Sequence, residues 1–331
     1  MANVREIAKQ AGVSIATVSR VLNNHPSVSE AVRERVLAAA NQHRYVPKIG
    51  RRETMNIAYV YTGDVSLGSP FDSAVLEGVY ASLSETDWNL MLLDVRRTRR
   101  NDETYSQMFQ RLGVRGAILR TTSSNHAVCL KIAEHGFPAV VVGERFNEPN
   151  VTSVYCESRT ASHEAVAHLI GLGHQRIAIC VNVVDDSDHE ERLTGYRDAM
   201  QEAGLPVEDK LILRAPAHRG GGEQVIRRLA TALDRPTAIY ITDPMTALGA
   251  MYEARRLGIR IPEDLSIIGF DDTEVRYMTW PIMTAVCQNA YELGQHACRL
   301  LNQMLNGTVS NILPAPPAWL EIHESTGPAP S

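Results

Sequence analysis

Small polar side chains and one arginine recur at helical spacing between residues 14 and 23. In the segment SIATVSRVLN, Val18, Val21 and Leu22 predict one apolar stripe. The opposite side of that helix must then carry Ile15, Ala16, Ser19, Arg20 and Asn23. A helix face without bulk can enter the major groove of DNA, where arginine binds guanine and short hydroxyl or amide groups reach phosphates and base edges. The pattern alone fits DNA recognition and a plain surface helical hairpin about equally well.

Two further helices are expected to hold this one in place. Apolar residues recur at three- and four-residue spacing over 4–11, with Asn3 as the expected cap. Gly12 supplies the permissive backbone of a tight turn, and Ser14 caps the second helix. Ser29 is expected to cap a third helix, whose apolar side completes a small core: Val32, Val36, Leu37 and Ala40.

Charge is distributed unevenly along the chain. Residues 1–52 hold nine Lys and Arg against three Asp and Glu, a net charge of +6. The whole chain of 331 residues has a formal net charge of −5, so the remainder carries −11. A short basic head on a long acidic body is typical of a nucleic-acid-binding segment attached to a body with a different task.

Two runs within the first 48 residues carry a more specific pattern. They are VREIAKQAGVSIATVSRVLN and VSEAVRERVLAAANQHRYVPK, and they resemble the headpiece of the LacI/GalR (lactose/galactose repressor) family of bacterial transcription regulators. The resemblance implies that the second helix reads the major groove of a near-palindromic operator, with Ile15 and Ala16 at the positions that vary with operator sequence. The implied DNA contacts are Asn3, Ser14, Ile15, Ala16, Thr17, Ser19, Arg20, Asn23, Ser29 and Tyr45.

The segment after the headpiece departs from the family pattern. Family members usually continue into a hinge helix of the form Asn-x-x-Ala-Arg-x-Leu, whose leucine wedges into the minor groove. Here Arg52 matches the hinge arginine, but Lys48, Arg51 and Thr54 replace the Asn, Ala and Leu. We therefore expect a shortened hinge over 48–55 and slight bending of the operator. Arg51 and Arg52 can still reach phosphates or a narrow minor groove.

From Asn56 onward, short apolar runs alternate with helical segments. The runs include IAYVYT, NLMLLDV, GAILRT, AVVVGE and VTSVYC, followed by RIAICV, KLILRA, AIYITD and LSIIGF. Two such series predict two α/β lobes, each with a largely parallel sheet covered on both faces. The expected fold class is α/β, with a helix-turn-helix headpiece and a two-lobed core like that of periplasmic binding proteins.

These patterns predict the following division of the chain. The headpiece is expected over 1–47, the hinge over 48–55 and the core for effector binding and dimerisation over 56–331. Within the core, lobe 1 is expected over about 56–157 and 287–315, and lobe 2 over about 158–286 and 316–331.

Ligands of open α/β sheets bind beyond the carboxyl ends of the strands. The residues expected there are mostly charged: Asp64, Asp94, Arg96, Arg120, Glu144, Arg145, Asn182, Asp243, Asp271 and Asp272. Converging carboxylates and amides suit a ligand with many hydroxyls, because each buried hydroxyl needs donor and acceptor partners. We therefore expect a small carbohydrate-type effector between the lobes.

The family resemblance sharpens this expectation at particular positions. Arg192 and Asp271 fall on the arginine and aspartate that contact effectors in the family. Thr242 and Ala290 stand where a sugar-binding member has asparagine and phenylalanine, so we expect a site rebuilt for another molecule. The full set of candidate effector residues is Phe71, Asp94, Arg120, Arg145, Arg192, Thr242, Asp243, Asp271 and Trp280.

Several candidates have a structural alternative. Phe71 and Trp280 can form an apolar platform or simply pack beside a loop proline. Asp243 precedes Pro244, which is also the pattern of a helix cap. Asp271 can order a loop instead of binding an effector.

Arginines gather at the ends of the first-lobe strands. Arg96, Arg120 and Arg145 facing one cleft would repel one another unless acidic side chains or a bound anion lay between them. The candidate internal partners are Asp64, Asp94 and Glu144. The alternative is an acidic effector such as a sugar acid or a phosphosugar.

Other classes of protein lack support in the sequence. No apolar run reaches the ~20 residues of a membrane span, and the first residues contain no signal-peptide core. The five cysteines lack a C-x-x-C pair, which favours reduced, buried thiols and no metal site. Neither a nucleophile–base pair nor a cofactor motif is found, so we expect no enzyme and no cofactor.

The predicted function is that of a cytoplasmic DNA-binding regulator, most simply a repressor relieved by its effector. An activator that uses the effector as a co-regulator and a solute-binding protein of the same fold are the alternatives. We expect a homodimer, because two-fold operator half-sites need a two-fold protein. The C-terminal segment has no leucine heptads for a larger assembly.

Overall fold

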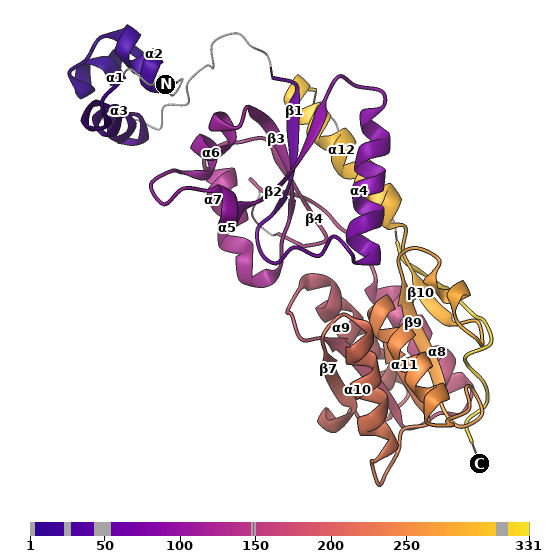
Figure 1. The fold of residues 1–331 in the computed structure, drawn as a ribbon. Helices are drawn as coiled ribbons and strands as arrows, with labels where there is room; N and C mark the ends of the chain where they lie inside the picture. The colour runs from indigo at the N-terminus through magenta and orange to yellow at the C-terminus, as the bar shows by residue number, and fades with distance from the viewer. Residues whose placement is uncertain are drawn as a thin grey trace.

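The computed structural model describes residues 4–22, 28–42, 54–146, 148, 150–308 and 317–330. Its first part, here called the headpiece, consists of three helices (Figure 1): α1 (Val4–Ala11), α2 (Ile15–Leu22) and α3 (Glu30–Gln42). Apolar side chains from all three form one core, which includes Ile7, Ala8, Val18, Val21 and Val36. The hydroxyl of Ser14 accepts a hydrogen bond from the main-chain N–H of Thr17 at 3.1 Å, so the predicted cap of α2 is confirmed.

Lobe 1 is built on a five-stranded parallel sheet in the order β2-β1-β3-β4-β5. The strands are β1 (Asn56–Tyr61), β2 (Asn89–Asp94), β3 (Val114–Arg120), β4 (Ala139–Val142) and β5 (Thr152–Val154). One face of the sheet packs on α4 (Pro70–Leu83) and α12 (Ala290–Asn306). The other face packs on α5 (Val95–Thr98), α6 (Tyr105–Arg111) and α7 (His126–Glu134). The predicted α/β layering is thus confirmed.

Lobe 2 is built on a six-stranded sheet in the order β11-β10-β9-β8-β6-β7. Its strands are β6 (Ile177–Asn182), β7 (Ile212–Ala215), β8 (Ala238–Ile241), β9 (Ser266–Asp271), β10 (Thr284–Cys287) and β11 (Trp319–Glu321). Helices α8 (Arg159–Gly171) and α9 (Ser187–Glu202) cover one face, and α10 (Arg219–Ala230) and α11 (Pro244–Arg256) cover the other. Only β11 is antiparallel to its neighbour among these described strands.

The chain passes between the lobes more than once. It leaves lobe 1 after β5, returns after β10 as α12, and reaches lobe 2 again as β11. The carboxyl ends of β1, β3 and β4 in lobe 1 and of β6, β8 and β9 in lobe 2 therefore face one another across the junction (Figure 1). This is the edge at which parallel sheets bind ligands.

Burial of the thiols agrees with the sequence-based expectation, because all five cysteines are free and buried. Among the described residues, no group of three or more His, Cys, Asp or Glu side chains is arranged to hold a metal ion. Within the same ranges, none of the helices combines the length and apolar character that a membrane span needs.

Two helix pairs approach closely through glycine. A Cβ added at Gly78 of α4 would lie 1.9 Å from the carbonyl oxygen of Tyr291 in α12, and one at Gly294 would lie 2.1 Å from that of Val75. The α10–α11 pair has the same arrangement at Gly222 and Gly249. These contacts fix the helix spacing on one face of each lobe, because no side chain fits between the backbones.

Substitution Gly78→Ala is expected to lower the free energy of unfolding by about 1–3 kcal/mol or more, because the methyl group forces α4 and α12 apart. Gly171→Ala is the matched control: this helical glycine has no atom within 4 Å of an added Cβ. The control is expected to be neutral or stabilising by about 0.5–1 kcal/mol. Urea unfolding of both variants checks this, and equal stability of the two would contradict the close-packing argument.

Candidate functional site

The outward face of α2 carries the residues that the sequence assigned to DNA. Ile15, Ala16, Ser19 and Arg20 are exposed, and Thr17 is half-buried, whereas Val18 is buried against the other helices. Ile15 is notable because nearly half of this apolar side chain is accessible. The face is thus free of bulk and presents one arginine, which is the geometry that a major-groove helix needs.

Ser14 and Ser29 stand at the starts of α2 and α3, and both are exposed. The Ser14 hydroxyl already caps α2 through its bonds to Thr17. The remaining predicted DNA contacts lie outside the described residues: Asn3, Asn23, Tyr45, Arg51 and Arg52.

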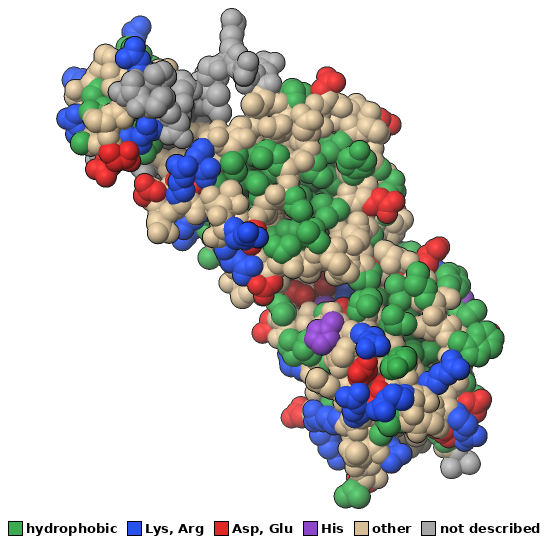
Figure 2. Space-filling view, in the orientation of Figure 1, with side chains coloured by type: hydrophobic (Ala, Val, Ile, Leu, Met, Phe, Trp, Pro, Cys, Tyr) green, Lys and Arg blue, Asp and Glu red, His purple; other side chains and the backbone are tan. Residues whose placement is uncertain are grey.

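A second candidate site is the cleft between the two lobes, a cavity of about 430 Å³. In Figure 2, acidic side chains are visible in the hollow where the lobes meet. Lobe 1 lines the cleft mainly with the start of α4 and the end of β3, and lobe 2 with the start of α9 and the ends of β6, β8 and β9. Its charged lining residues are Asp64, Asp72, Arg120, Asp186, Asp188, His189, Arg192, Asp243 and Asp272.

Four predicted effector residues lie on this cleft: Phe71, Arg120, Arg192 and Asp243. The Arg120 guanidinium lies 4.9 Å from the centre of the Phe71 ring, so the two form one platform from lobe 1. Asp243 also accepts a hydrogen bond from the main-chain N–H of Thr246 at 2.7 Å. It therefore caps α11 and lines the cleft at the same time.

Asp72, which sequence reasoning missed, is the partner of Arg120. Its buried carboxylate accepts from Arg120 Nε at 3.0 Å, from the Tyr59 hydroxyl at 3.3 Å and from the Ser69 hydroxyl at 2.9 Å, and also from the hydroxyl of Ser66. Burial raises the pKa of Tyr59 well above its usual range, and the Asp72 charge adds to this effect. The lobe 1 wall is thus a preorganised network around one carboxylate–guanidinium pair.

Arg192 forms the corresponding wall of lobe 2. Its guanidinium lies 3.5 Å from the centre of the Phe270 ring, and Nη1 donates to the carbonyl oxygen of Thr242 at 2.8 Å. Nη2 lies 3.9 Å from Asp188 Oδ2, one helical turn earlier in α9. The Thr242 hydroxyl donates to the carbonyl oxygen of Cys180 below the cleft, so Thr242 positions Arg192 through its main chain and does not line the cavity.

Asp271 lies beneath the cleft, and its contacts are those of the loop-ordering alternative. Its carboxylate accepts hydrogen bonds from the main-chain N–H groups of Thr273, Val275 and Arg276, at 2.9–3.0 Å. It also accepts from the Arg276 guanidinium at 2.8 Å. These bonds hold the start of the 3-10 turn η3 (Val275–Met278) and place the neighbouring Asp272 on the cleft.

Three further candidates do not lie on the cleft. Asp94 caps α5 by accepting from the main-chain N–H of Arg96. Arg145 pairs with Glu191 and stacks at 4.3 Å over the ring of Tyr155. Trp280 is 77% exposed on the loop after η3 and points to the molecular surface.

The first-lobe arginines are neutralised within the protein. Arg96 pairs with Asp64 at 2.7 Å and lies 3.5 Å from Asp94, as the sequence suggested. Arg120 and Arg145 find other partners, because helices α4 and α9 bring Asp72 and Glu191 to them. The three guanidiniums therefore do not converge on one anion site.

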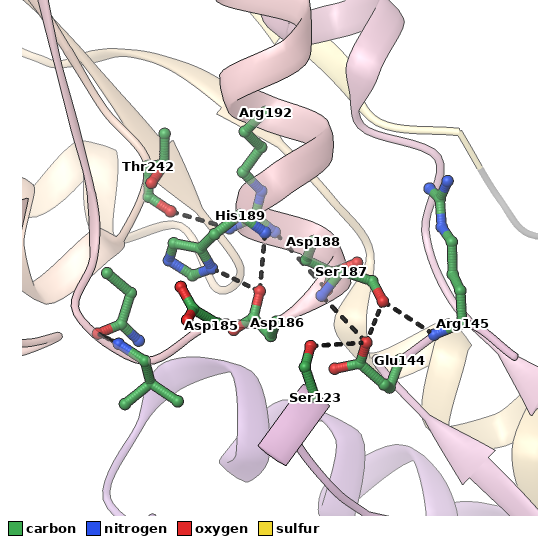
Figure 3. Close-up of polar contacts among 12 residues, drawn as sticks. Ser123, Glu144, Arg145, Asp185, Asp186, Ser187, Asp188, His189, Arg192 and Thr242 are labelled. Atoms are coloured by element: carbon green, nitrogen blue, oxygen red, sulfur yellow. Dashed lines mark hydrogen bonds and ion pairs between the residues drawn. The ribbon is translucent and has the colours of Figure 1, made fainter. Parts of the chain in front are cut away.

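Glu144, the third expected partner, joins the two lobes instead. This fully buried residue follows β4, and its Oε1 accepts from the main-chain N–H of Ser187 at 3.1 Å and from the Ser187 hydroxyl. The Ser187 hydroxyl in turn accepts from the main-chain N–H of Arg145 at 3.3 Å. Figure 3 shows these groups converging at the first turn of α9, and we call Glu144, Arg145 and Ser187 the interlobe clasp.

The first turn of α9 also carries the residues that turn into the cleft. Asp186 caps the helix and accepts from the main-chain and ring N–H groups of His189, which holds the pKa of Asp186 well below its usual range despite burial. Burial raises the pKa of Asp188 to about 6, and the Asp186 charge adds to this. The acidic run DDSDHEE one turn before Arg192 is the sequence signal that could have identified them.

Comparisons with known proteins agree with this division into headpiece and cleft. Residues 3–48 match the family model for bacterial regulatory proteins of the lacI family, and residues 166–326 match a periplasmic binding protein-like domain. The chain is 30% identical to the HTH-type transcriptional regulator DegA of Bacillus subtilis (strain 168), covering 98% of each protein. It is 32% identical to the ribose operon repressor of Haemophilus influenzae, covering 94% of each.

A solved structure also matches nearly the full length. The complex of the transcriptional regulator CelR with cellobiose superposes with a TM-score of 0.71 at 28% identity, covering 98% of this chain and 100% of that one.

The free energy of unfolding is expected to fall as pH rises through the range in which the buried carboxylates of the cleft ionise. Burial, aided by the charges of Asp243 and Asp271, raises the pKa of Asp272 to about 7. A carboxyl group of the unfolded chain titrates near pH 4. The native state therefore binds the extra protons between about pH 4 and pH 7, and the stability they provide is lost as pH rises through the native pKa values.

Asp272→Asn is expected to flatten this dependence, and the free energy of unfolding without ligand, measured from pH 5 to pH 8, checks it. Comparison with the wild type is essential because burial lowers the pKa values of His168, His174 and His296, which act in the opposite direction. Parallel curves for the two proteins would show that Asp272 does not carry the effect.

Proposed function

We propose a function for this chain from the premise that it belongs to the lacI family of bacterial regulatory proteins. It is a transcriptional regulator with a helix-turn-helix headpiece, not an enzyme. Our proposal is that it represses transcription from an operator and is released when a carbohydrate-type effector binds between the lobes. The observation that carries this proposal is that α9 both lines the cleft and joins the lobes through Ser187.

For the operator we propose direct contacts from the exposed face of α2, above all from Arg20. The residues proposed to touch DNA are Asn3, Ser14, Ile15, Ala16, Thr17, Ser19, Arg20, Asn23, Ser29, Tyr45, Arg51 and Arg52. The shortened hinge over 48–55 is proposed to bend the operator only slightly, since it lacks the leucine wedge. A protein acting on operator DNA works in the cytoplasm, at the nucleoid.

For the effector we propose a polyhydroxylated molecule held by residues of both lobes. Arg120 and Phe71 supply one wall, and Arg192 and Asp243 supply the other. The ribose operon repressor and the CelR–cellobiose complex support a sugar, because their names associate regulators of this architecture with carbohydrates. Asp271 and Thr242 are proposed to position the cleft residues from below.

The interlobe clasp is the proposed link between effector and operator. An effector that contacts Asp188 or Arg192 acts on the same helix whose first N–H group is bound by Glu144. A shift of α9 must therefore change the fit of lobe 1 against lobe 2. If the operator favours one arrangement of the lobes, effector and operator change each other's affinity by the same factor, typically worth ~1–3 kcal/mol.

We propose a homodimer as the DNA-binding form. Large apolar side chains are exposed on both lobes, including Tyr80, Leu92, Met278 and Trp280. Figure 2 shows hydrophobic side chains gathered over lobe 1 and continuing onto the adjoining part of lobe 2. Such a surface suits a protein–protein interface. Trp280, expected from sequence to line the effector site, is thus proposed to lie in the dimer contact.

Arg20→Ala is expected to weaken operator binding by about 1–3 kcal/mol, as the loss of one base or phosphate contact would. Arg35→Ala is the matched control, because Arg35 is an exposed arginine of α3 outside the proposed contact set. Titrations at fixed salt against operator fragments selected from genomic DNA compare the two. Equal losses would indicate a general charge effect and contradict recognition through α2.

A sugar that binds only the folded protein raises its melting temperature. Such a sugar is expected to lower operator affinity, because effector and operator are proposed to favour different arrangements of the lobes. Glu144→Gln is expected to keep the thermal response but to reduce the change in DNA affinity, since the clasp has lost its charge. A screen of sugars by melting temperature, followed by DNA titration, checks both. If the sugar instead strengthens DNA binding, the result favours the co-regulator alternative. If the sugar leaves operator affinity unchanged, the result contradicts regulation through the cleft.

A further inference from the structure

The lobe 2 side of the cleft has more negative charge than its positive side chains balance. Asp186, Asp188, Asp243 and Asp272 line it, whereas Arg192 is the only arginine that lobe 2 contributes within the described lining. Arg120 comes from lobe 1 and is bound to Asp72, although its charge also acts on Asp188 across the cleft. His189 is likewise hydrogen-bonded to Asp186.

Several buried polar atoms of this wall have no hydrogen-bond partner in the protein. Asp188 is 7% exposed and its Oδ1 is unpaired, and Gln288 is 4% exposed and its Oε1 is unpaired. Both residues line the cleft, and both free atoms are acceptors. Leaving a buried acceptor without a donor costs about 1–3 kcal/mol, so these atoms are suited to a donor supplied by a ligand.

Two more unpaired nitrogen atoms accompany these acceptors. Arg192 Nε and His189 Nε2 are also buried. The Arg192 Nε–H group can donate to a sugar oxygen, and His189 Nε2 accepts from a sugar hydroxyl when Nδ1 carries the ring proton that it donates to Asp186. This wall therefore offers groups that can bind sugar hydroxyls, together with a set of hydrogen-bond acceptors in which carboxylates predominate.

We propose that the effector is an amino sugar, whose protonated amine lies against Asp188, Asp272 and Gln288. This inference rests on the proposed function, since it takes the cleft as the effector site. A neutral hydroxyl can satisfy the hydrogen bonds of these acceptors but cannot balance their charge. An ammonium group does both, because it carries three donors and a full positive charge.

The remaining contacts agree with this assignment. Gln288 Nε2 donates to Asp272 Oδ1 at 2.5 Å, which turns the free Gln288 oxygen beside the carboxylate it holds. Burial raises the pKa values of Asp188 and Asp272, and the nearby charge of Arg192 offsets this only in part. An acidic effector would add to this imbalance, since Arg96, Arg120 and Arg145 are already paired with carboxylates.

Calorimetric titration at pH 7 and constant ionic strength tests the inference with matched probes. These are glucosamine, glucose and glucuronate, together with galactosamine, galactose and galacturonate. At least one amino sugar is expected to bind about tenfold or more tightly than its neutral partner, with the acid weakest. Tighter binding of a neutral or acidic member within both series, or no binding of either amino sugar, would overturn the proposal.

Two variants locate the effect. Asp188→Asn preserves size and removes one buried charge, so it is expected to fold and to reduce the preference for the amino sugar about tenfold. Glu202→Gln is the matched control, because it removes one negative charge at the exposed far end of α9, and it is expected to leave the preference within twofold. Equal preferences in the two variants would also overturn the assignment.

DNA titration with the same sugars separates this inference from the proposed function. If a neutral sugar binds best and weakens operator binding, the regulator proposal holds and the amino-sugar proposal fails. If the amino sugar binds as expected but operator affinity does not change, the amino-sugar assignment holds and regulation through the cleft fails.

Discussion

The position of α9 depends on one buried carboxylate. Glu144 is fully buried after β4 of lobe 1, and it binds the first N–H group and the first hydroxyl of α9 in lobe 2. The Ser123 hydroxyl of lobe 1 donates to the same Oε1 at 3.4 Å, and His126 Nε2 lies 3.1 Å away without hydrogen-bond geometry, so Ser187 supplies the donors that come from lobe 2. A buried carboxylate deprived of its donors costs on the order of several kcal/mol. The lobes therefore cannot separate at this point unless water or another donor replaces Ser187.

This constraint explains why the chemistry of the cleft and the arrangement of the lobes are connected. Asp188 and Arg192 follow Ser187 within the same two turns, so a ligand bound to either side chain acts on a rigid element. Backbone hydrogen bonds join each turn of a helix to the next, so a displacement of one turn moves its neighbours. A ligand with different affinity for two lobe positions then shifts their populations.

The sequence predicts those parts of the fold and of the candidate site that are decided by residues close together in the chain. The headpiece helices and the strands follow from apolar periodicity and caps such as Ser14, because neighbouring residues decide both. Asp72 was missed because its partner Arg120 is 48 residues away, and only the fold brings them to 3.0 Å. The loop bonds of Asp271 are local, but a carboxylate after a strand fits a ligand or a turn equally well.

The charged groups at the strand ends show why composition alone does not identify the ligand. From the sequence, three arginines at the ends of lobe 1 strands are expected to pair with Asp64, Asp94 and Glu144, and an anionic effector is the alternative. The fold supplies each of them with a carboxylate, partly from helices that the strand pattern does not place. Four aspartates of lobe 2 still line the cleft beside Arg192, the only arginine from that lobe among the described lining residues, and burial raises the pKa values of Asp188 and Asp272. The chemistry of a cleft is set by the charges that remain after its side chains pair with one another. In this cleft the remaining charge is negative.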